Sequence, residues 1–193
     1  PVIFFKVRKF RIFSELKERA KPVMRVISWN INSVRLRAPL VEKLIAEAKP
    51  DVICLQETKC PNDSFPEKLF HKLGYSHIAK NGIKGYHGVA TLARLPMAET
   101  NIVTYCDRID GRHIETVFET TNGPLHVHNF YVPAGGDEPD PEINEKFAHK
   151  LAFLDEMETN LVTTTFQVVW NSHLSNHIHQ VLQAKILPMN LYI

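Results

Sequence analysis

The sequence predicts an α/β fold in which helices cover a largely buried sheet, and three observations support this prediction. Strand-like and helix-like apolar patterns alternate along residues 24–157. The stretch "DVICLQETK" (51–59) begins with an almost continuous apolar run, which is typical of a strand buried on both faces. The turn signal "TNGP" lies between two further strand patterns and predicts a hairpin, so the sheet is at least partly antiparallel.

Each predicted element has a local signal of its own. Strands are expected where apolar runs end in polar or turn residues, at 24–32, 51–59, 87–95 and on both sides of "TNGP" within 113–133. Helices are expected where apolar residues recur at helical spacing, at 38–50, 66–75 and 140–157. Pro50 ends the first helix, Gly74 ends the second, and a proline stands in the first turn of the third.

The composition is that of one domain of ordinary size. The chain has 193 residues, of which 44% are hydrophobic and 23% are charged. No apolar run approaches the roughly 20 residues of a membrane helix, and the opening "PVIFFKVRKFRIF" does not match a secretory signal. The 3 cysteines lack paired spacing, which argues against a disulfide scaffold or a zinc site. We therefore expect a reducing, cytoplasmic location and no membrane partner.

Charge divides the chain into three segments. Residues 1–23 hold 7 basic and 2 acidic residues, and we interpret them as a basic leader or non-native extension. Residues 24–157 carry the alternating strand and helix patterns. Residues 158–193 contain only 2 charged residues, Glu158 and Lys185, which is too few for a solvated surface and indicates a divergent or frameshifted tail. A functional basic arm that touches phosphates is the alternative for the first segment.

Polar side chains follow two of the predicted strands. Asn30 and Asn32 end "SWNIN", and Gln56 and Glu57 end the apolar part of "LQETK". A carboxylate with nearby amides suits Mg²⁺, which prefers oxygen ligands and needs only one or two protein carboxylates. At a phosphodiester the ion would polarise a phosphoryl oxygen. These residues alone favour a plainer interpretation, in which Glu57 ends a strand in solvent and Asn30 caps a turn.

Four ordered motifs carry a resemblance to a known family. "SWNINSVR", "PDVICLQETK", "KGYHGVA" and "NFYVPAGG" occur in this order in a sequence that resembles the exonuclease III family of DNA repair nucleases and apurinic/apyrimidinic endonucleases. The resemblance runs from Met24 to about Met157. It implies a four-layer α/β/β/α sandwich of the endonuclease/exonuclease/phosphatase type. It also implies Mg²⁺-dependent hydrolysis of phosphodiesters, with Mn²⁺ as an alternative ion, in double-stranded DNA at abasic sites or 3′ ends by a monomer.

The resemblance assigns roles to individual residues. Glu57 matches the carboxylate that binds the metal, and Asn30 matches an asparagine that helps to organise the metal and the attacking group. Tyr131 matches the tyrosine that contacts the scissile phosphate. The remaining matches lie near the DNA strand, and they are Lys59, Arg112, Tyr86 and His87.

The end of the chain departs from the family pattern. Family members continue with a GDxN motif, whose aspartate orients and deprotonates the attacking water, and finish with SDH, whose histidine stabilises phosphate charge. Neither motif occurs after Met157, and no aspartate follows Asp155. We therefore expect weak or no activity from this truncated chain. The alternatives are a non-catalytic DNA- and Mg²⁺-binding remnant, and a relative that acts on another phosphoester.

The histidines of the predicted hairpin have a plainer interpretation. His126 and His128 alternate on one strand, so they share a face of the sheet, and we interpret both as structural. His113 is interpreted in the same way. In the tail, His173 and His177 would share a helix face, but no carboxylate or cysteine stands near them to complete a metal site.

Overall fold

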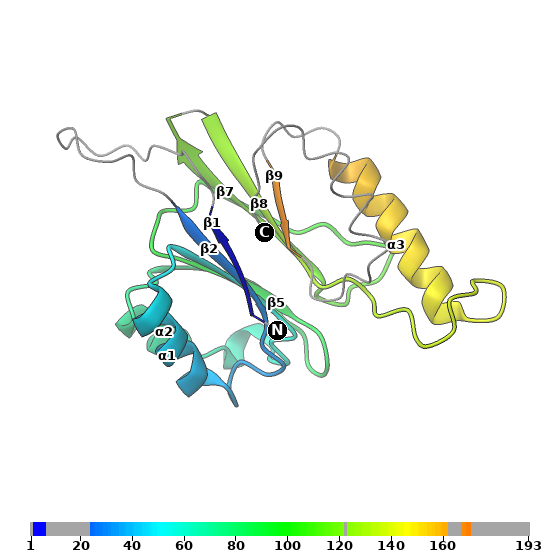
Figure 1. Ribbon diagram of the computed structural model, residues 1–193, viewed down its shortest axis with the longest axis horizontal. Helices are drawn as coiled ribbons and strands as arrows, with labels where there is room; N and C mark the ends of the chain where they lie inside the picture. Colours follow the sequence, from blue (N-terminus) through cyan, green and yellow to red (C-terminus); the bar gives the residue numbers. More distant parts are fainter. Residues whose placement is uncertain (1, 7–23, 122, 162–166, 171–193) are drawn as a thin grey trace.

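The protein is built around two β-sheets that lie face to face. The computed structural model describes residues 2–6, 24–121, 123–161 and 167–170, which form a five-stranded and a four-stranded sheet (Figure 1). Within these residues no helix combines the length and the apolar character that crossing a membrane requires. The predicted α/β class is confirmed.

The first sheet has the strand order β1-β2-β3-β5-β4. β2 and β3 run parallel, and the other neighbours are antiparallel. The central strand β3 is buried at every position, as its apolar run predicts. The bounds are β1 Val2–Lys6, β2 Arg25–Asn30, β3 Val52–Gln56, β4 His77–Asn81 and β5 Val89–Ala93.

The second sheet has the order β6-β7-β8-β9. β7 and β8 form the predicted hairpin, in which Thr120 pairs with Gly123 across the turn. β9 pairs with β8 in parallel. The bounds are β6 Glu99–Asn101, β7 His113–Thr120, β8 Gly123–Phe130 and β9 Gln167–Trp170.

Helices cover both outer faces of the sheet pair, which gives the four layers of the expected sandwich (Figure 1). α1 (Ala38–Ala48) and α2 (Glu67–Lys72) pack on the first sheet, where apolar side chains of α1 and α2 join Ile53 and Leu55 in one cluster. A short 3₁₀ turn, Asn62–Ser64, precedes α2. α3 (Glu145–Leu161) packs on the second sheet through Phe153 and Met157.

A buried polar network joins the two sheets. Gln56, at the end of β3, is fully buried, and its Nε2 donates to Oδ1 of Asn129 on β8 at 2.7 Å. Asn129 Nδ2 donates to the backbone oxygen of Ala90 at 2.9 Å. Since an unpaired buried amide is costly, this pairing holds the first sheet against the second in one alignment.

Several elements differ from the expectation. β1, β4, β6 and β9 carry no strong periodic signal and were not predicted from the sequence. The third helix begins at Glu145 instead of residue 140, because the Oδ1 of Asn144 accepts the backbone N–H of Lys146 and so caps the helix start. The division of the chain at residues 23 and 157 stays a prediction, and residues 7–23, 162–166 and 171–193 lie outside the described residues.

Candidate active site at the sheet edge

The parallel pairing of β2 and β3 brings their polar ends to one edge of the first sheet. Asn30 pairs with Gln56 in the register, and Glu57 follows directly. Asn30 Nδ2 donates to Glu57 Oε1 at 2.6 Å. The other amide atom, Asn30 Oδ1, is buried and has no hydrogen-bond partner among the described residues. A buried oxygen that lacks a donor is a site where a ligand or an ion can bind.

The backbone turns sharply at Glu57. Glu57 and Lys59 both have left-handed φ angles, of 52° and 49°, which ordinary side chains rarely adopt. The 84–88 loop holds this turn, because Thr58 N–H donates to the oxygen of Gly88 at 3.0 Å. A Cβ atom at Gly88 would lie 2.3 Å from Thr58 Oγ1, so only glycine fits at this contact. Backbone strain of this kind is commonly found at functional sites.

Hydrogen bonds determine the charge state of Glu57. Its side chain is 14% exposed. Burial acts to raise the pKa of this carboxyl group, but hydrogen bonds from Asn30, Lys59 and Tyr131 outweigh burial and lower the pKa below its ordinary value. Glu57 is therefore an ionised carboxylate at neutral pH, in the form that binds a cation.

Tyr131 approaches the same carboxylate from the second sheet. It lies just past the end of β8, and its hydroxyl donates to Glu57. Burial and the nearby negative charge of Glu57 raise the pKa of Tyr131 to about 12, so the phenol keeps its proton at neutral pH. A protonated phenol is a hydrogen-bond donor for an anionic oxygen.

Arg112 contacts both the ring and the backbone of Tyr131 and holds them in place. Its guanidinium carbon lies 4.8 Å from the centre of the Tyr131 ring, and Nη1 donates to the Tyr131 backbone oxygen at 2.9 Å. Two neighbours orient the guanidinium, which forms an ion pair with Asp110 and donates from Nη2 to His87 Nε2 at 3.0 Å. His87 Nδ1 in turn donates to the backbone oxygen of Asp110 at 3.1 Å. Burial and Arg112 lower the pKa of His87, which favours the neutral ring.

Lys59 lies on the solvent side of the site. Its ammonium group is 3.3 Å from Glu57 Oε2 and donates to Asn32 Oδ1 at 2.6 Å. The same nitrogen is 5.7 Å from the centre of the Tyr86 ring. Tyr86 is 79% exposed, so its ring is free to stack on a ligand.

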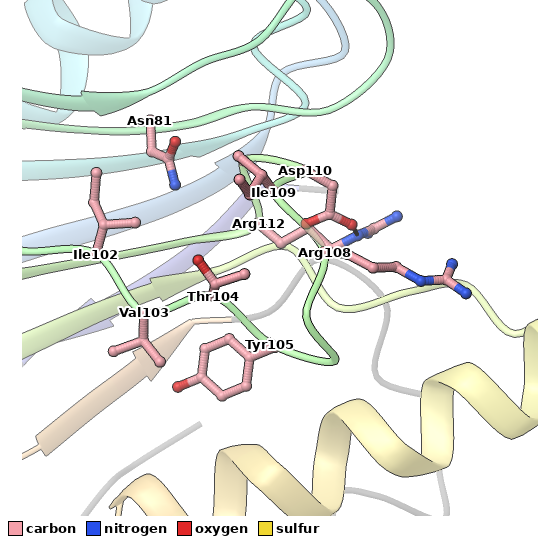
Figure 2. Close-up of a pocket in the computed structure, with 10 residues that line it drawn as sticks. Asn81, Ile102, Val103, Thr104, Tyr105, Arg108, Ile109, Asp110 and Arg112 are labelled. Carbon is pink, nitrogen blue, oxygen red and sulfur yellow. Dashed lines mark hydrogen bonds and ion pairs between the residues drawn. The ribbon is translucent and has the colours of Figure 1, made fainter.

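A small cavity lies beside this site rather than at Glu57. It has a volume of about 40 Å³ and is lined by Arg112, Asp110 and Tyr105, among others (Figure 2). Such a volume holds a few water molecules at most. Neither Glu57 nor Asn30 lines it. The cavity is therefore separate from the group around Glu57 at the sheet edge.

All the predicted site residues meet at this edge, directly or through one neighbour. Asn30, Glu57, Lys59 and Tyr131 form one hydrogen-bonded group. Arg112 and His87 join this group through Tyr131, and Tyr86 joins it through Lys59. Their roles stay predictions, since proximity alone does not test them.

The sequence interpretation missed two residues of the site. The sequence does not single out Asp110, yet its carboxylate pairs with Arg112 and its backbone oxygen accepts from His87. Its position two residues before Arg112 is the one signal that could have pointed to it. Asn32 was noted as a strand end, but its contact with Lys59 was not foreseen.

The chain is similar to several known proteins. The Endonuclease/Exonuclease/phosphatase family matches residues 27–179. An exodeoxyribonuclease III of Haemophilus influenzae is 38% identical over 114 residues, which is 58% of this chain and 42% of that protein. A solved AP endonuclease from Archaeoglobus fulgidus has a TM-score of 0.65 and 30% identity, and the alignment covers 77% of this chain and 56% of the other.

A third relative was solved with nucleic acid. It is a 3′ phosphatase from Neisseria bound to a product DNA hairpin, with a TM-score of 0.63, 26% identity, and coverage of 77% of this chain and 56% of the other. The chain thus spans about half the length of the proteins that it matches. The family match covers most of this chain, and the solved relatives have a similar fold over the part that aligns. The protein belongs to the endonuclease/exonuclease/phosphatase family.

Proposed function

We propose that the chain is the metal-binding part of a Mg²⁺-dependent nuclease of the exonuclease III type. Its substrate would be double-stranded DNA, hydrolysed at abasic sites or at 3′ ends. The observation that carries the proposal is the unpartnered Oδ1 of Asn30 beside the ionised carboxylate of Glu57. The names of the relatives, which include an exodeoxyribonuclease and an AP endonuclease, support the choice of DNA.

The residues at the sheet edge fit a magnesium ion. Glu57 offers a charged oxygen and Asn30 a neutral one, and Mg²⁺ needs no more than one or two protein carboxylates because it keeps several waters. Mn²⁺ has similar ligand preferences and would substitute. When bound, the ion would supply positive charge next to a phosphoryl oxygen.

The neighbouring side chains would bind and orient the DNA strand. The protonated hydroxyl of Tyr131 would donate to an oxygen of the scissile phosphate, and Arg112 would keep the phenol ring in place. Lys59 would neutralise a phosphate, and the exposed Tyr86 ring would stack on a base or sugar. Arg112 and His87 would act mainly through Tyr131.

We further propose that this chain alone cleaves slowly. The family pattern uses an aspartate to deprotonate the attacking water, and no aspartate follows Asp155 in this sequence. Cleavage would then depend on a water that no side chain deprotonates. A cytoplasmic location and a monomeric state belong to the same proposal.

A cleavage assay tests the function directly. A labelled duplex with one abasic site is incubated with the full chain in Mg²⁺, in Mn²⁺ and in EDTA. We expect slow cleavage that EDTA abolishes, and a loss of at least about 100-fold in Glu57→Gln, because the carboxylate charge is removed. The matched control is Glu47→Gln on α1, which is exposed and should cleave as the wild type does.

Metal binding separates this function from its alternatives. Calorimetric titration with Mg²⁺ should detect a site in the wild type that Glu57→Gln lacks. Binding of Mg²⁺ and DNA without any cleavage would instead support a non-catalytic remnant. Equal Mg²⁺ affinity in the wild type and Glu57→Gln would overturn the assignment of Glu57.

A further inference from the structure

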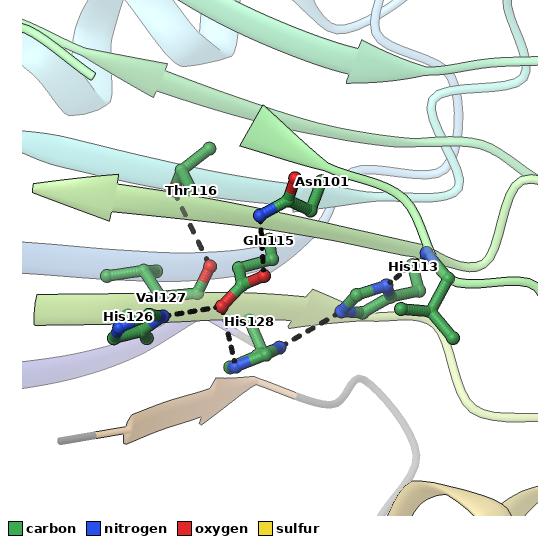
Figure 3. Close-up of polar contacts among 8 residues, drawn as sticks. Asn101, His113, Glu115, Thr116, His126, Val127 and His128 are labelled. Carbon is green, nitrogen blue, oxygen red and sulfur yellow. Dashed lines mark hydrogen bonds and ion pairs between the residues drawn. The ribbon is translucent and has the colours of Figure 1, made fainter. Parts of the chain in front are cut away.

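A second polar cluster lies on the other side of the protein's second sheet. Glu115 on β7 and His126 and His128 on β8 point away from the first sheet, on the face that α3 partly covers (Figure 3). The register places Glu115 directly opposite His128. One potential ligand atom from each of the three residues lies within 4.8 Å of the other two. We call these three residues the Glu115 cluster.

We propose that the Glu115 cluster binds a divalent transition metal such as Zn²⁺, at a site separate from Glu57. Two imidazoles and a carboxylate are a common three-residue ligand set for zinc, and a water molecule completes the tetrahedron. Magnesium prefers oxygen ligands and would not favour this site. The inference does not depend on the proposed nuclease function.

An unpartnered buried nitrogen points into the cluster. The His128 side chain is 9% exposed, and its Nε2 has no hydrogen-bond partner among the described residues. This atom lies 3.4 Å from Glu115 Oε1. His126 Nδ1 lies on the same oxygen at 2.6 Å, and His126 is accessible enough for an ion to enter from solvent. The three donors therefore need only small shifts to surround one ion.

Neighbouring groups keep His113 and His128 uncharged and hold one oxygen of Glu115. Burial and the neighbouring histidine keep the pKa values of His113 and His128 far below the ordinary value, at about 3 and about 4, so both rings are neutral. Burial acts to raise the pKa of Glu115, but hydrogen bonds from His126 and Asn101 lower it overall. Asn101 Nδ2 donates to Glu115 Oε2 at 3.1 Å, which leaves Oε1 for the metal.

His113 connects His128 to the loop at Val103 by two hydrogen bonds. The Val103 N–H donates to His113 Nδ1 at 3.1 Å, so His113 carries its proton on Nε2 and donates it to His128 Nδ1, also at 3.1 Å. A metal on His128 Nε2 moves the His128 proton to Nδ1. His113 must then accept at Nε2 and carry its own proton on Nδ1, facing the Val103 N–H. The Val103 N–H then loses its hydrogen bond to His113.

Zinc titration of the full chain tests the proposal. Metal is first removed with a chelator, and Zn²⁺ is then titrated in competition with a chromophoric indicator. We expect one tight site that weakens by at least about 100-fold in His126→Ala and in the shape-preserving Glu115→Gln, and by roughly 10-fold in Asn101→Ala. His71→Ala removes an exposed histidine from α2 and should bind zinc as the wild type does. Circular dichroism confirms that each variant is folded.

One result would overturn the site, and another would overturn the proton path through His113. One is an affinity for zinc that is the same in His126→Ala and His71→Ala, which would place the metal elsewhere in the chain. The other comes from the Val103 amide in ¹⁵N-resolved NMR spectra. Its resonance should move on loading with Zn²⁺ and stay in place with Mg²⁺, and an unmoved resonance at saturating Zn²⁺ would contradict the proton path through His113.

Discussion

Among the described residues, two partly buried glutamates have lowered pKa values, and their surroundings differ. Glu57 lies at the edge of the first sheet among an amide, a lysine and a tyrosine. Glu115 lies on a face of the second sheet among imidazoles and one amide. The pKa of Tyr131 beside Glu57 is raised to about 12, mainly by burial, whereas burial lowers the pKa of His128 beside Glu115 to about 4.

These different surroundings determine which ion or anion each site suits. Oxygen donors and fixed positive charge around Glu57 suit a hard ion and a phosphate, because Lys59 and Arg112 would attract the same anion. Nitrogen donors around Glu115 suit a softer metal. A glutamate therefore indicates little by itself, and the atoms within hydrogen-bond reach decide its chemistry.

The two asparagines beside these glutamates give the strongest test of the contrast. Asn30→Ala removes the oxygen that would bind Mg²⁺, so Mg²⁺ affinity and cleavage should fall by about 100-fold while zinc binding stays unchanged. Asn101→Ala should do the reverse, with roughly 10-fold weaker zinc binding. Calorimetry with each ion on both variants measures this. If either variant weakens both ions equally, the two sites are not independent.

Acid should destabilise the second sheet around His113 and His128 at a higher pH than it affects the Glu57 site. His113 and His128 have folded pKa values of about 3 and about 4, below their ordinary 6.5, so the unfolded chain binds more protons in this window. Their stabilisation is complete above pH 6.5 and is lost as the pH falls toward 4. We expect the free energy of unfolding to drop by roughly 4 kcal/mol between pH 7 and pH 5, about half of it from each ring.

Urea titrations at the two pH values measure this drop. His128→Gln should be less stable than the wild type at pH 7 but should lose less on acidification, because one buried ring no longer gains a proton. The same pH dependence in both proteins would mean that other groups cause the loss.

Of the three predictions, Lys59→Ala has the smallest expected effect, and it acts on DNA binding. Lys59→Ala removes one phosphate contact, so DNA affinity should weaken several-fold and the salt dependence of binding should fall by about one unit in slope. Fluorescence anisotropy over a series of KCl concentrations, with Ca²⁺ in place of Mg²⁺, measures binding without cleavage. Lys43→Ala, on the exposed face of α1, is the matched control. Identical slopes for the two variants would remove Lys59 from the DNA contact.

The sequence was sufficient for those parts of the fold whose signal is local. β3 was recognised from its apolar run and the hairpin from "TNGP", because burial and turn chemistry act within a few residues. β4 was missed, since it packs at the edge of its sheet, buries only Ala79 and has no clear alternation. Edge strands depend on their neighbour more than on their own residues.

The sites divide in the same way. Asn30 and Glu57 could be paired from sequence because both follow parallel strands. Asp110 is harder to identify, since its importance comes from contacts with Arg112, two residues later, and with His87, 23 residues earlier. The sequence pattern identified only the histidines of the Glu115 cluster. The histidines were noticed, but the hairpin register that sets Glu115 opposite His128 was not used.

The amide contact between Gln56 and Asn129 has a consequence for biosynthesis. Its two partners are 73 positions apart, so Gln56 leaves the ribosome long before Asn129 is translated. During that interval the strands of the first sheet can pair with one another. The face of this sheet that packs against β8 is still uncovered. The nascent chain therefore passes through a stage in which an apolar sheet face is uncovered, and this is the stage at which we expect chaperones to engage it.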